Sequence, residues 1–209
     1  MGEVLGGRVG EVLGGRVGEI IVLRHGQTEW SRSGQHTGVT DLPLLPEGEE
    51  QARALGTALT GWSFVDVWVS PRQRARRTAE LAGLTPTQVD DALVEVDYGG
   101  YEGRTTAAIS AELGRDWSVW RDGTIPGETP GETLAAVGDR VDRLLDRVRD
   151  RLTDGDVALV AHGHVLRVLT ARWLGLPAQA GALFALAAGS YGVLGHEHAR
   201  PVLSAWALH

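Results

Sequence analysis

The stretch Ile20-Ile21-Val22-Leu23-Arg24-His25-Gly26-Gln27-Thr28 sets the architecture of the whole chain. Its first four residues are apolar and mostly β-branched, which predicts a buried strand. Arg24 and His25 follow where that strand should leave the core in a glycine turn. Two polar side chains that can carry positive charge are costly to bury there without partners. Because ligands of open α/β sheets bind at the carboxyl ends of the strands, we predict that Arg24 and His25 form one half of an anion site.

The length and composition indicate one folded domain. The chain has 209 residues, of which 43% are hydrophobic, and one α/β domain with a sizeable core accounts for this length. No apolar run reaches the roughly 18 residues of a membrane span, and the N-terminus lacks a secretory signal pattern. We therefore expect a cytoplasmic protein with no membrane partner. The formal net charge of −7 argues against nucleic acid as a partner, because phosphate backbones are bound by a broad basic face.

Cysteine and lysine are both absent from the sequence. Their absence excludes thiolate catalysis, cysteine-based metal sites, Schiff-base chemistry and a P-loop lysine. All 20 basic residues are arginines. An anion bound by this protein must therefore be held by guanidinium, imidazole or backbone N–H groups.

The N-terminal segment is a duplication. Residues 2–9 read GEVLGGRV, and residues 10–17 repeat them letter for letter. A glycine-rich octapeptide cannot bury a core of its own, and two copies are too few for a solenoid. We expect residues 1–18 to be a flexible tail without a functional role, followed by a single domain over residues 19–209.

Strand and helix patterns alternate along this domain. Residues 30–46 are polar and rich in turn formers, which predicts a binding loop. The alternation predicts a three-layer α/β/α sandwich with a mostly parallel central sheet and helices on both faces. An exposed edge hairpin would be compatible with a homodimer. Further strands are predicted at residues 65–69 and 157–161, helices at 46–59, from about 72, at 133–152 and at 165–174, and the hairpin over 191–208.

Two of the predicted strands end in the same way, Leu23-Arg24-His25-Gly26 and Val160-Ala161-His162-Gly163. If both strands are central, their histidines face each other at the carboxyl edge of the sheet. The Ser70-Pro71 turn directs Arg74, on the first turn of the next helix, to the same edge. These cationic groups repel one another unless an anion lies between them. Phosphate suits the site because arginine binds its oxygens in bidentate fashion, and the helix after His162 adds backbone N–H groups.

Several motifs, taken in order, resemble the histidine phosphatase superfamily, which has the phosphoglycerate-mutase-like fold. They extend over residues 20–167, and although one Arg-His-Gly triplet is weak, the ordered set is specific. The motifs are Leu23-Arg24-His25-Gly26-Gln27-Thr28, Gly38-x-x-Asp41-x-Pro43-Leu44, Ser70-Pro71-x-x-Arg74-Ala75-x-x-Thr78-Ala79, Leu93-x-Glu95, Tyr98-Gly99-x-Tyr101-Glu102-Gly103, Gly131-Glu132-Thr133 and His162-Gly163.

The resemblance implies a metal-independent phosphomonoesterase that needs no cofactor and acts on a small-molecule phosphate monoester. It implies that His25 is the nucleophile and becomes a phosphohistidine. It also implies that Arg24, Arg74 and His162 bind the phosphoryl oxygens. Glu95 would donate a proton to the leaving oxygen and then activate water. Substrate contacts are expected from Ser31, His36, Thr37, Gly38, Tyr98 and Gly163.

The sequence departs from the family pattern around the expected substrate pocket. Ser31 stands where the family usually has an asparagine, and Arg72 replaces a common leucine. Leu45 replaces a threonine or serine that would cap the following helix. His36 stands where many relatives carry a different side chain, so we expect it to touch the substrate. These departures do not affect the five core residues Arg24, His25, Arg74, Glu95 and His162. They prevent identification of the leaving group from the sequence.

Two alternatives concern the chemistry of the site. Asp97 or Glu102, rather than Glu95, could be the acid. A metallohydrolase could also use the two histidines that lie two residues apart. Arg24 and Arg74 argue against this second alternative, because they would repel a cation at the same place. The metal ligands would be His36, Asp97, His162 and His164.

Two further alternatives concern the class of protein. A phosphoglycerate-mutase-type transferase of the same family would move phosphate within a sugar-acid substrate, with a bisphosphate cofactor. Such enzymes usually resemble longer chains with an extra covering segment, and this favours the phosphatase. A phosphate-binding module without catalysis would have lost one of the five core residues, and none is lost.

Overall fold

The computed structural model describes residues 17–209, so residues 1–16 of the predicted tail lie outside the described residues. Gly18, which we assigned to the tail, is buried. Its amide donates to the carbonyl oxygen of Leu152 at 2.8 Å. The packed body of the protein therefore includes Gly18.

One six-stranded sheet runs through the described part of the chain, in the order β3-β2-β4-β1-β5-β6. Strands β1 to β4 are mutually parallel, and β5 and β6 form the predicted antiparallel hairpin at one edge. Sequence patterns missed β3, because two residues are too short to show a period. The strands are β1 (Ile20–Arg24), β2 (Phe64–Val69), β3 (Gln88–Val89), β4 (Asp156–Ala161), β5 (Tyr191–Glu197) and β6 (Arg200–Leu208).

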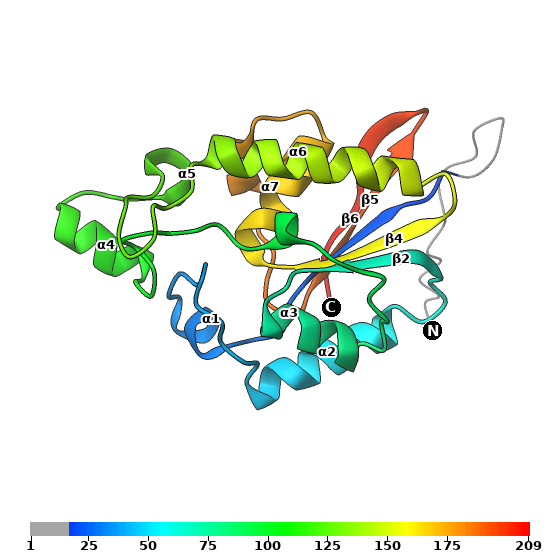
Figure 1. Ribbon diagram of the computed structural model, residues 1–209, viewed down its shortest axis with the longest axis horizontal. Coiled ribbons are helices and arrows are strands. Elements are labelled where there is room, and N and C mark those ends of the chain that lie inside the picture. Colours follow the sequence, from blue (N-terminus) through cyan, green and yellow to red (C-terminus); the bar gives the residue numbers. More distant parts are fainter. Residues whose placement is uncertain (1–16) are drawn as a thin grey trace, which may run out of the picture.

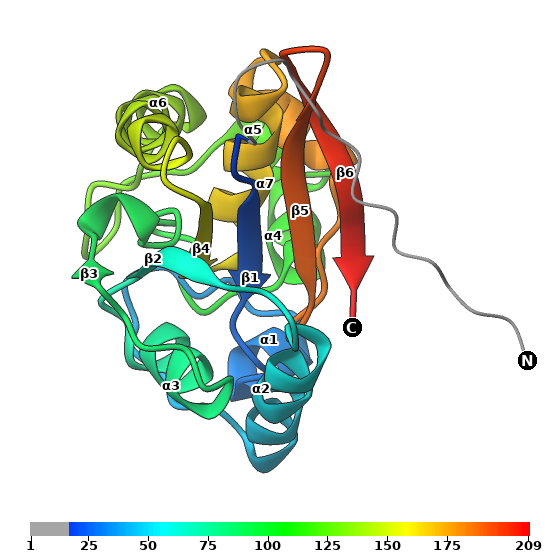
Figure 2. The same ribbon diagram turned by 90° about the vertical axis from the view of Figure 1, so that its right-hand side faces the viewer.

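Helices cover both faces of this sheet, which confirms the predicted α/β/α sandwich (Figures 1 and 2). Helices α2 (Pro46–Ala58) and α3 (Gln73–Leu81) pack on one face, and α6 (Leu134–Arg151) and α7 (Gly163–Trp173) on the other. The shorter helices are α1 (Glu29–Ser33), α4 (Thr106–Leu113), α5 (Val119–Asp122) and the 3-10 turns Asp91–Leu93 and Ala178–Leu183. Figure 1 shows α1, α4 and α5 beyond the sheet edge at which β1 ends.

The alternation of side chains along β1 divides the core in two. Ile20 and Val22 belong to the core shared with α6 and α7, whereas Ile21 and Leu23 belong to the core under α2 and α3. All four side chains are completely buried, and each burial contributes about 1.5–3 kcal/mol to stability. Arg24, two residues after Val22, is therefore directed toward the α7 face.

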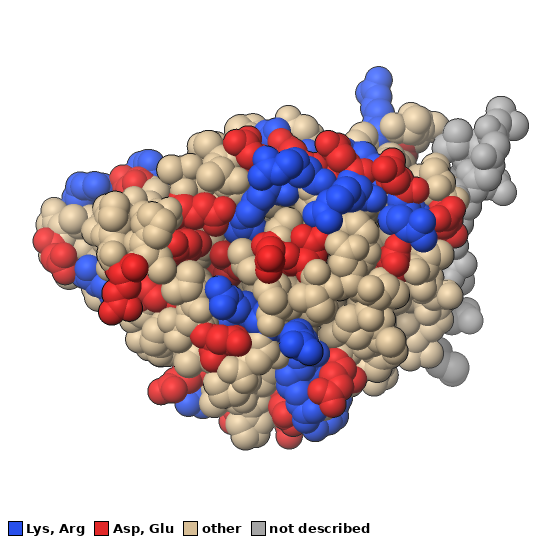
Figure 3. Space-filling view, viewed as in Figure 1, with Lys and Arg blue, Asp and Glu red and all other residues tan. Residues whose placement is uncertain are grey.

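Helix α6 is amphipathic, as its sequence predicts. Leu144, Leu145 and Val148 are completely buried, while arginines and acidic residues alternate on its outer face (Figure 3). Several of these arginines pair with other elements, as in the 2.6 Å contact of Arg147 with Asp90. Among residues 17–209, no helix combines the length and apolarity that crossing a bilayer requires.

Part of the predicted binding loop, residues 30–46, is helical. Thr28 and Ser31 form a reciprocal capping box: the Ser31 amide donates to Thr28 Oγ1 at 3.2 Å, and the Thr28 amide donates to Ser31 Oγ at 2.8 Å. This cap starts α1, which ends at Gly34 in the left-handed conformation with φ 79°. The sequence pattern did not predict this helical turn, because the cap uses serine instead of the usual Glu or Gln.

Candidate active site

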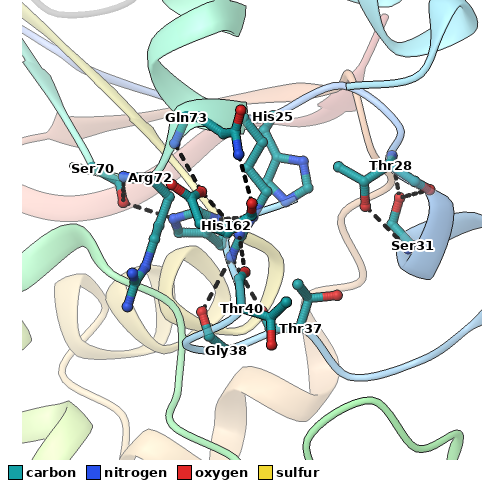
Figure 4. Close-up of polar contacts among 12 residues, drawn as sticks. His25, Thr28, Ser31, Thr37, Gly38, Thr40, Ser70, Arg72, Gln73 and His162 are labelled. Carbon is teal, nitrogen blue, oxygen red and sulfur yellow. Dashed lines mark hydrogen bonds and ion pairs between the residues drawn. The ribbon is translucent and has the colours of Figure 1, made fainter. Parts of the chain in front are cut away.

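The register of the central strands brings the two predicted histidines together. Arg24 of β1 lies opposite Ala161 of β4, and the His25 amide donates to the Ala161 carbonyl oxygen at 3.0 Å. The ring centroids of His25 and His162 are 5.1 Å apart. The end of β2 places Ser70 on the other side of His162 (Figure 4). As predicted, the ends of separate strands assemble one site.

His25 keeps one ring nitrogen free to react. Its Nδ1 lies 2.7 Å from the carbonyl oxygen of Gly26. Because a carbonyl oxygen only accepts hydrogen bonds, the proton is on Nδ1 and Nε2 holds the lone pair. Burial, and then the charges of Arg74 and Arg24, hold the pKa of His25 well below its ordinary value. His25 is therefore a neutral imidazole whose Nε2 carries an unprotonated lone pair.

The turn that follows His25 requires glycine. A Cβ atom on Gly26 would lie 2.1 Å from the carbonyl oxygen of Gly48 in α2. No side chain fits in this space. The close approach of the turn to α2 holds the carbonyl that fixes the tautomer of His25.

His162 has partners on both ring nitrogens. Arg74 Nε donates to His162 Nδ1 at 3.1 Å, which leaves the proton on Nε2. That Nε2–H donates to Ser70 Oγ at 2.7 Å. Burial, followed by the charge of Arg74, lowers the pKa of His162 well below its ordinary value. This imidazole is neutral and held in one orientation.

Arg74 is completely buried beside His162. Its remaining donors bind the carbonyl oxygens of Thr40 at 2.9 Å, Thr37 at 3.2 Å and Gly38 at 3.3 Å. A buried guanidinium needs such partners because unpaired donors are costly away from water. Arg74 thus connects residues 37–40 to His162. Thr37 and Gly38, which we expected to touch substrate, accept hydrogen bonds from Arg74 with their carbonyl oxygens.

Arg24 reaches across the start of α7. Its guanidinium lies so close to Gly163 that a Cβ there would be 3.0 Å from Arg24 Cζ. One terminal nitrogen donates to the Leu186 carbonyl oxygen at 2.5 Å. Within residues 17–209, the buried Arg24 Nε has no hydrogen-bond partner. Gly163, expected to contact substrate, therefore provides the space that the Arg24 guanidinium occupies beside the start of α7.

Glu95 occupies the N-terminus of α7. Its Oε2 accepts from the His164 amide at 2.9 Å, and its Oε1 accepts from the amides of Val165 at 2.9 Å and Val96 at 3.0 Å. The side chain is only 7% exposed. The helix N–H groups of His164 and Val165, which we expected to bind the anion, instead fix this carboxylate at the positive end of the helix dipole.

The two rival acids hold loops in place. Asp97 accepts hydrogen bonds from the amides of Gly99 and Gly131 and from the Thr129 hydroxyl. Glu102 accepts from the amides of Gly38 and Thr40. Neither carboxylate lines the pocket described next, whereas Glu95 does.

A pocket of about 150 Å³ opens beside His25. It brings together three of the five predicted catalytic residues, while His162 and Arg74 are completely buried next to it. Gly34, Gln35 and His164 also line it and were missing from the predicted substrate contacts. A larger groove of about 730 Å³ over α2 and α3 carries none of the five. The pocket is lined by Arg24, His25, Ser31, Gly34, Gln35, His36, Thr37, Glu95, Tyr98 and His164.

The predicted contact Ser31 lines the pocket but has its hydroxyl engaged, since Ser31 Oγ also donates to the Thr28 carbonyl oxygen at 3.1 Å. Its main contact is thus with the capping box of α1.

Three rings form the aromatic wall of the pocket, by which we mean His36, Tyr98 and His164. The Tyr98 hydroxyl and His164 Nδ1 are hydrogen bonded at 2.7 Å, and the ring centroids of His36 and Tyr98 are 4.7 Å apart. Burial lowers the pKa of His36 to about 4 and that of His164 well below its ordinary value. Burial also raises the pKa of Tyr98 well above 10. The aromatic wall is therefore polar but uncharged near neutral pH.

The metallohydrolase alternative requires a cluster of ligands. Residues 17–209 contain no group of three or more histidine, aspartate or glutamate side chains that could hold a metal ion. His162 has both ring nitrogens hydrogen bonded, and Asp97 holds the loop at residues 129–131.

Comparisons with known proteins agree with this geometry. The model of the histidine phosphatase superfamily, branch 1, matches residues 20–209. An acid phosphatase of Mycobacterium tuberculosis is 41% identical over 174 residues, which cover 82% of this chain and 83% of the relative. The sedoheptulose 1,7-bisphosphatase of Saccharomyces cerevisiae is 39% identical over 180 residues, covering 73% and 66% of the two chains.

A solved structure of an open reading frame product from Mycobacterium tuberculosis has a TM-score of 0.86 at 39% identity. The match covers 92% of this chain and 98% of that one. The family resemblance drawn from the motifs is thereby confirmed. This chain belongs to the histidine phosphatase superfamily, branch 1, and is a phosphatase of that family.

Proposed function

We propose that this enzyme is a metal-independent phosphomonoesterase that hydrolyses a small phosphorylated metabolite through a phosphohistidine at His25. The observation that carries the proposal is the hydrogen bond between His25 Nδ1 and the Gly26 carbonyl oxygen, which leaves Nε2 unprotonated in the pocket. The names of the relatives, acid phosphatase and sedoheptulose 1,7-bisphosphatase, support a phosphatase.

In the first step, His25 Nε2 attacks phosphorus and the bond from phosphorus to the leaving oxygen breaks. The proton of the Glu95 carboxylic acid goes to that oxygen, so an alcohol leaves and a carboxylate remains. The positive charge that develops on the imidazole is shared with the Gly26 carbonyl through Nδ1–H. A nucleophile that is already neutral needs no proton removal before attack.

In the second step, the Glu95 carboxylate takes a proton from water while the water oxygen attacks phosphorus. The bond from phosphorus to His25 Nε2 breaks, which restores the neutral imidazole and the protonated acid. Inorganic phosphate then leaves. Glu95 suits both steps because three backbone amides hold its carboxyl group in one position on the pocket wall.

The cationic groups stabilise charge on the transferred phosphoryl group. Arg24 is the one arginine among the described residues that lines the pocket, so we assign its guanidinium a direct contact with a phosphoryl oxygen. Arg74 adds a buried positive charge and, through Nε, holds His162 beside His25. Their electrostatic contribution requires no metal ion.

Hydrolysis of p-nitrophenyl phosphate in the presence of EDTA tests the proposal. We expect full activity with chelator, inhibition by vanadate, and an acid-labile, base-stable phosphoenzyme after rapid quench with radiolabelled substrate. A requirement for a divalent metal, or a phosphoenzyme stable in acid, would refute it. Conversion of 3-phosphoglycerate only when 2,3-bisphosphoglycerate is added would instead identify a mutase.

A further inference from the structure

The aromatic wall indicates which alcohol leaves. On the basis of the proposed phosphatase activity, we propose that the leaving group is an uncharged, hydroxyl-bearing alcohol of the sugar or polyol class. We further propose that the aromatic wall discriminates against leaving groups that carry a second anionic group. His36 and His164 are the residues we assign to this selection.

The size of the pocket places the leaving group against these rings. Its volume of about 150 Å³ is below the roughly 300–1,000 Å³ of pockets that enclose a drug-sized ligand. A phosphoryl group next to His25 and Arg24 occupies one part of this space. The first carbons of the leaving group must then lie along the remaining wall, where His36, Tyr98 and His164 are found.

The charges of the pocket disfavour a second anion. Among the described residues, Arg24 and Glu95 are the charged side chains that line it. Arg24 serves the phosphoryl group, which leaves the Glu95 carboxyl group nearest the leaving oxygen. A carboxylate or second phosphate on the leaving group would lie in this partly buried site without a cation to pair with, and burying an unpaired charge is costly.

Arg167, an arginine beyond the aromatic wall, already has partners. Arg167 Nε donates to the Gly181 carbonyl oxygen, and a terminal nitrogen donates to that of Ala182, both at 2.9 Å. Its guanidinium lies 4.5 Å from the ring centre of Trp120, and this indole in turn packs against His164. Arg167 therefore supports the wall through Trp120.

The aromatic wall itself suits hydroxyl groups. Ring faces offer apolar contact to carbons, while the ring nitrogens and the phenol offer neutral donors and acceptors. The His164–Tyr98 hydrogen bond and the packing of His36 on Tyr98 fix these groups in place. Such an arrangement recognises hydroxyls without binding a formal charge.

A matched pair of substrates tests this inference. Glycerol 3-phosphate and 3-phosphoglycerate share a three-carbon skeleton, and the main difference is a CH₂OH group in one and a carboxylate in the other. We expect kcat/KM to be at least tenfold higher for glycerol 3-phosphate. Equal or higher kcat/KM for 3-phosphoglycerate would overturn the inference. If neither of these substrates nor p-nitrophenyl phosphate were hydrolysed, the proposed function itself would be refuted.

Variants of His36 then test whether the aromatic wall determines the preference between the two substrates. His36→Lys supplies the missing cation, and we expect it to lower the ratio of the two kcat/KM values at least tenfold. His36→Gln keeps a neutral polar group and should leave the ratio within about threefold. An unchanged ratio in a folded His36→Lys enzyme would show that the aromatic wall does not select the substrate.

Thr106→Lys provides a second route if His36→Lys fails to fold, as judged by its thermal melting. Thr106 is exposed, and its hydroxyl lies 3.2 Å from His36 Nε2. A lysine there adds positive charge at the rim without entering the core. We expect the ratio to fall about threefold or more, and no fall would count against the proposal.

Discussion

His25 and His162 occupy equivalent places at the ends of neighbouring parallel strands, but their hydrogen bonds make them different groups. His25 donates from Nδ1 to the Gly26 carbonyl and keeps Nε2 open to the pocket. His162 receives Arg74 Nε on Nδ1 and donates from Nε2 to Ser70. The first is arranged to form a bond and the second to stay fixed.

The difference shows that the neighbours of a histidine, rather than its position on a strand, decide its role. In the proposed mechanism, a carbonyl beside Nδ1 leaves Nε2 of one imidazole unprotonated and able to act as the nucleophile. A guanidinium beside Nδ1 makes the other an acceptor there, with its proton on Nε2. Substitutions at the two positions and at their partners should therefore have unequal effects.

The largest effect is expected from His25→Ala. Removal of the nucleophile should lower kcat for p-nitrophenyl phosphate by about 10⁴-fold or more, because the covalent route is lost. Radiolabelled phosphoenzyme should be undetectable after rapid quench. Residual activity above one part in a hundred, with a normal melting temperature, would mean that His25 is not the nucleophile.

A smaller loss is expected from His162→Ala. The nucleophile remains, but Arg74 Nε loses the acceptor that holds its positive charge in place beside His25, so kcat should fall about 10²–10³-fold, in the range observed when stabilisation of transition-state charge is impaired. Phosphoenzyme should still form, only more slowly, in a single-turnover experiment. His162→Asn, whose amide can still accept from Arg74 and donate to Ser70, should recover part of the rate. Complete loss of phosphoenzyme in His162→Ala would show that the covalent role was assigned to the wrong histidine.

The sequence predicted the assembly of this site because strand patterns and strand ends are local features. Four apolar residues before Arg24, and five before His162, predict two buried strands whose carboxyl ends meet. The pairing of Arg24 with Ala161 follows once both strands are central. The Ser70-Pro71 turn added Arg74, and the family motifs added Glu95.

The partners of these residues could not be predicted, because they depend on tertiary packing. Nothing in the sequence shows that Arg74 binds the carbonyls at positions 37, 38 and 40. Likewise, the contact of Glu95 with two amides of α7 depends on how residue 95 returns to the sheet edge. Among the pocket-lining residues that were not predicted, only His164 could have been found from the sequence, because it is the second histidine of the His-Gly-His triplet.

Ser70 tests how far the fixed state of His162 depends on one hydroxyl. Ser70→Ala leaves the buried His162 Nε2–H without its acceptor, which should cost about 1–3 kcal/mol of stability and lower kcat roughly tenfold. The double variant Ser70→Ala/His162→Ala should be no less active than His162→Ala alone, because both changes remove the same interaction. Additive losses would show that Ser70 acts independently of His162.

The smallest effect is expected from acid. An imidazole of ordinary pKa, near 6.5, would be roughly 90% protonated at pH 5.5 and would lose about tenfold in nucleophilic rate. The pKa of His25 and that of His162 both lie well below this value, so kcat should change less than about threefold between pH 7 and 5.5. Stability, in contrast, should decline over this range, since the unfolded chain takes up protons below pH 6.5 that the buried neutral imidazoles refuse. A tenfold fall in kcat by pH 5.5, measured on enzyme that melts normally, would show that Nε2 of His25 is protonated there and is more basic than its hydrogen bonds and burial imply.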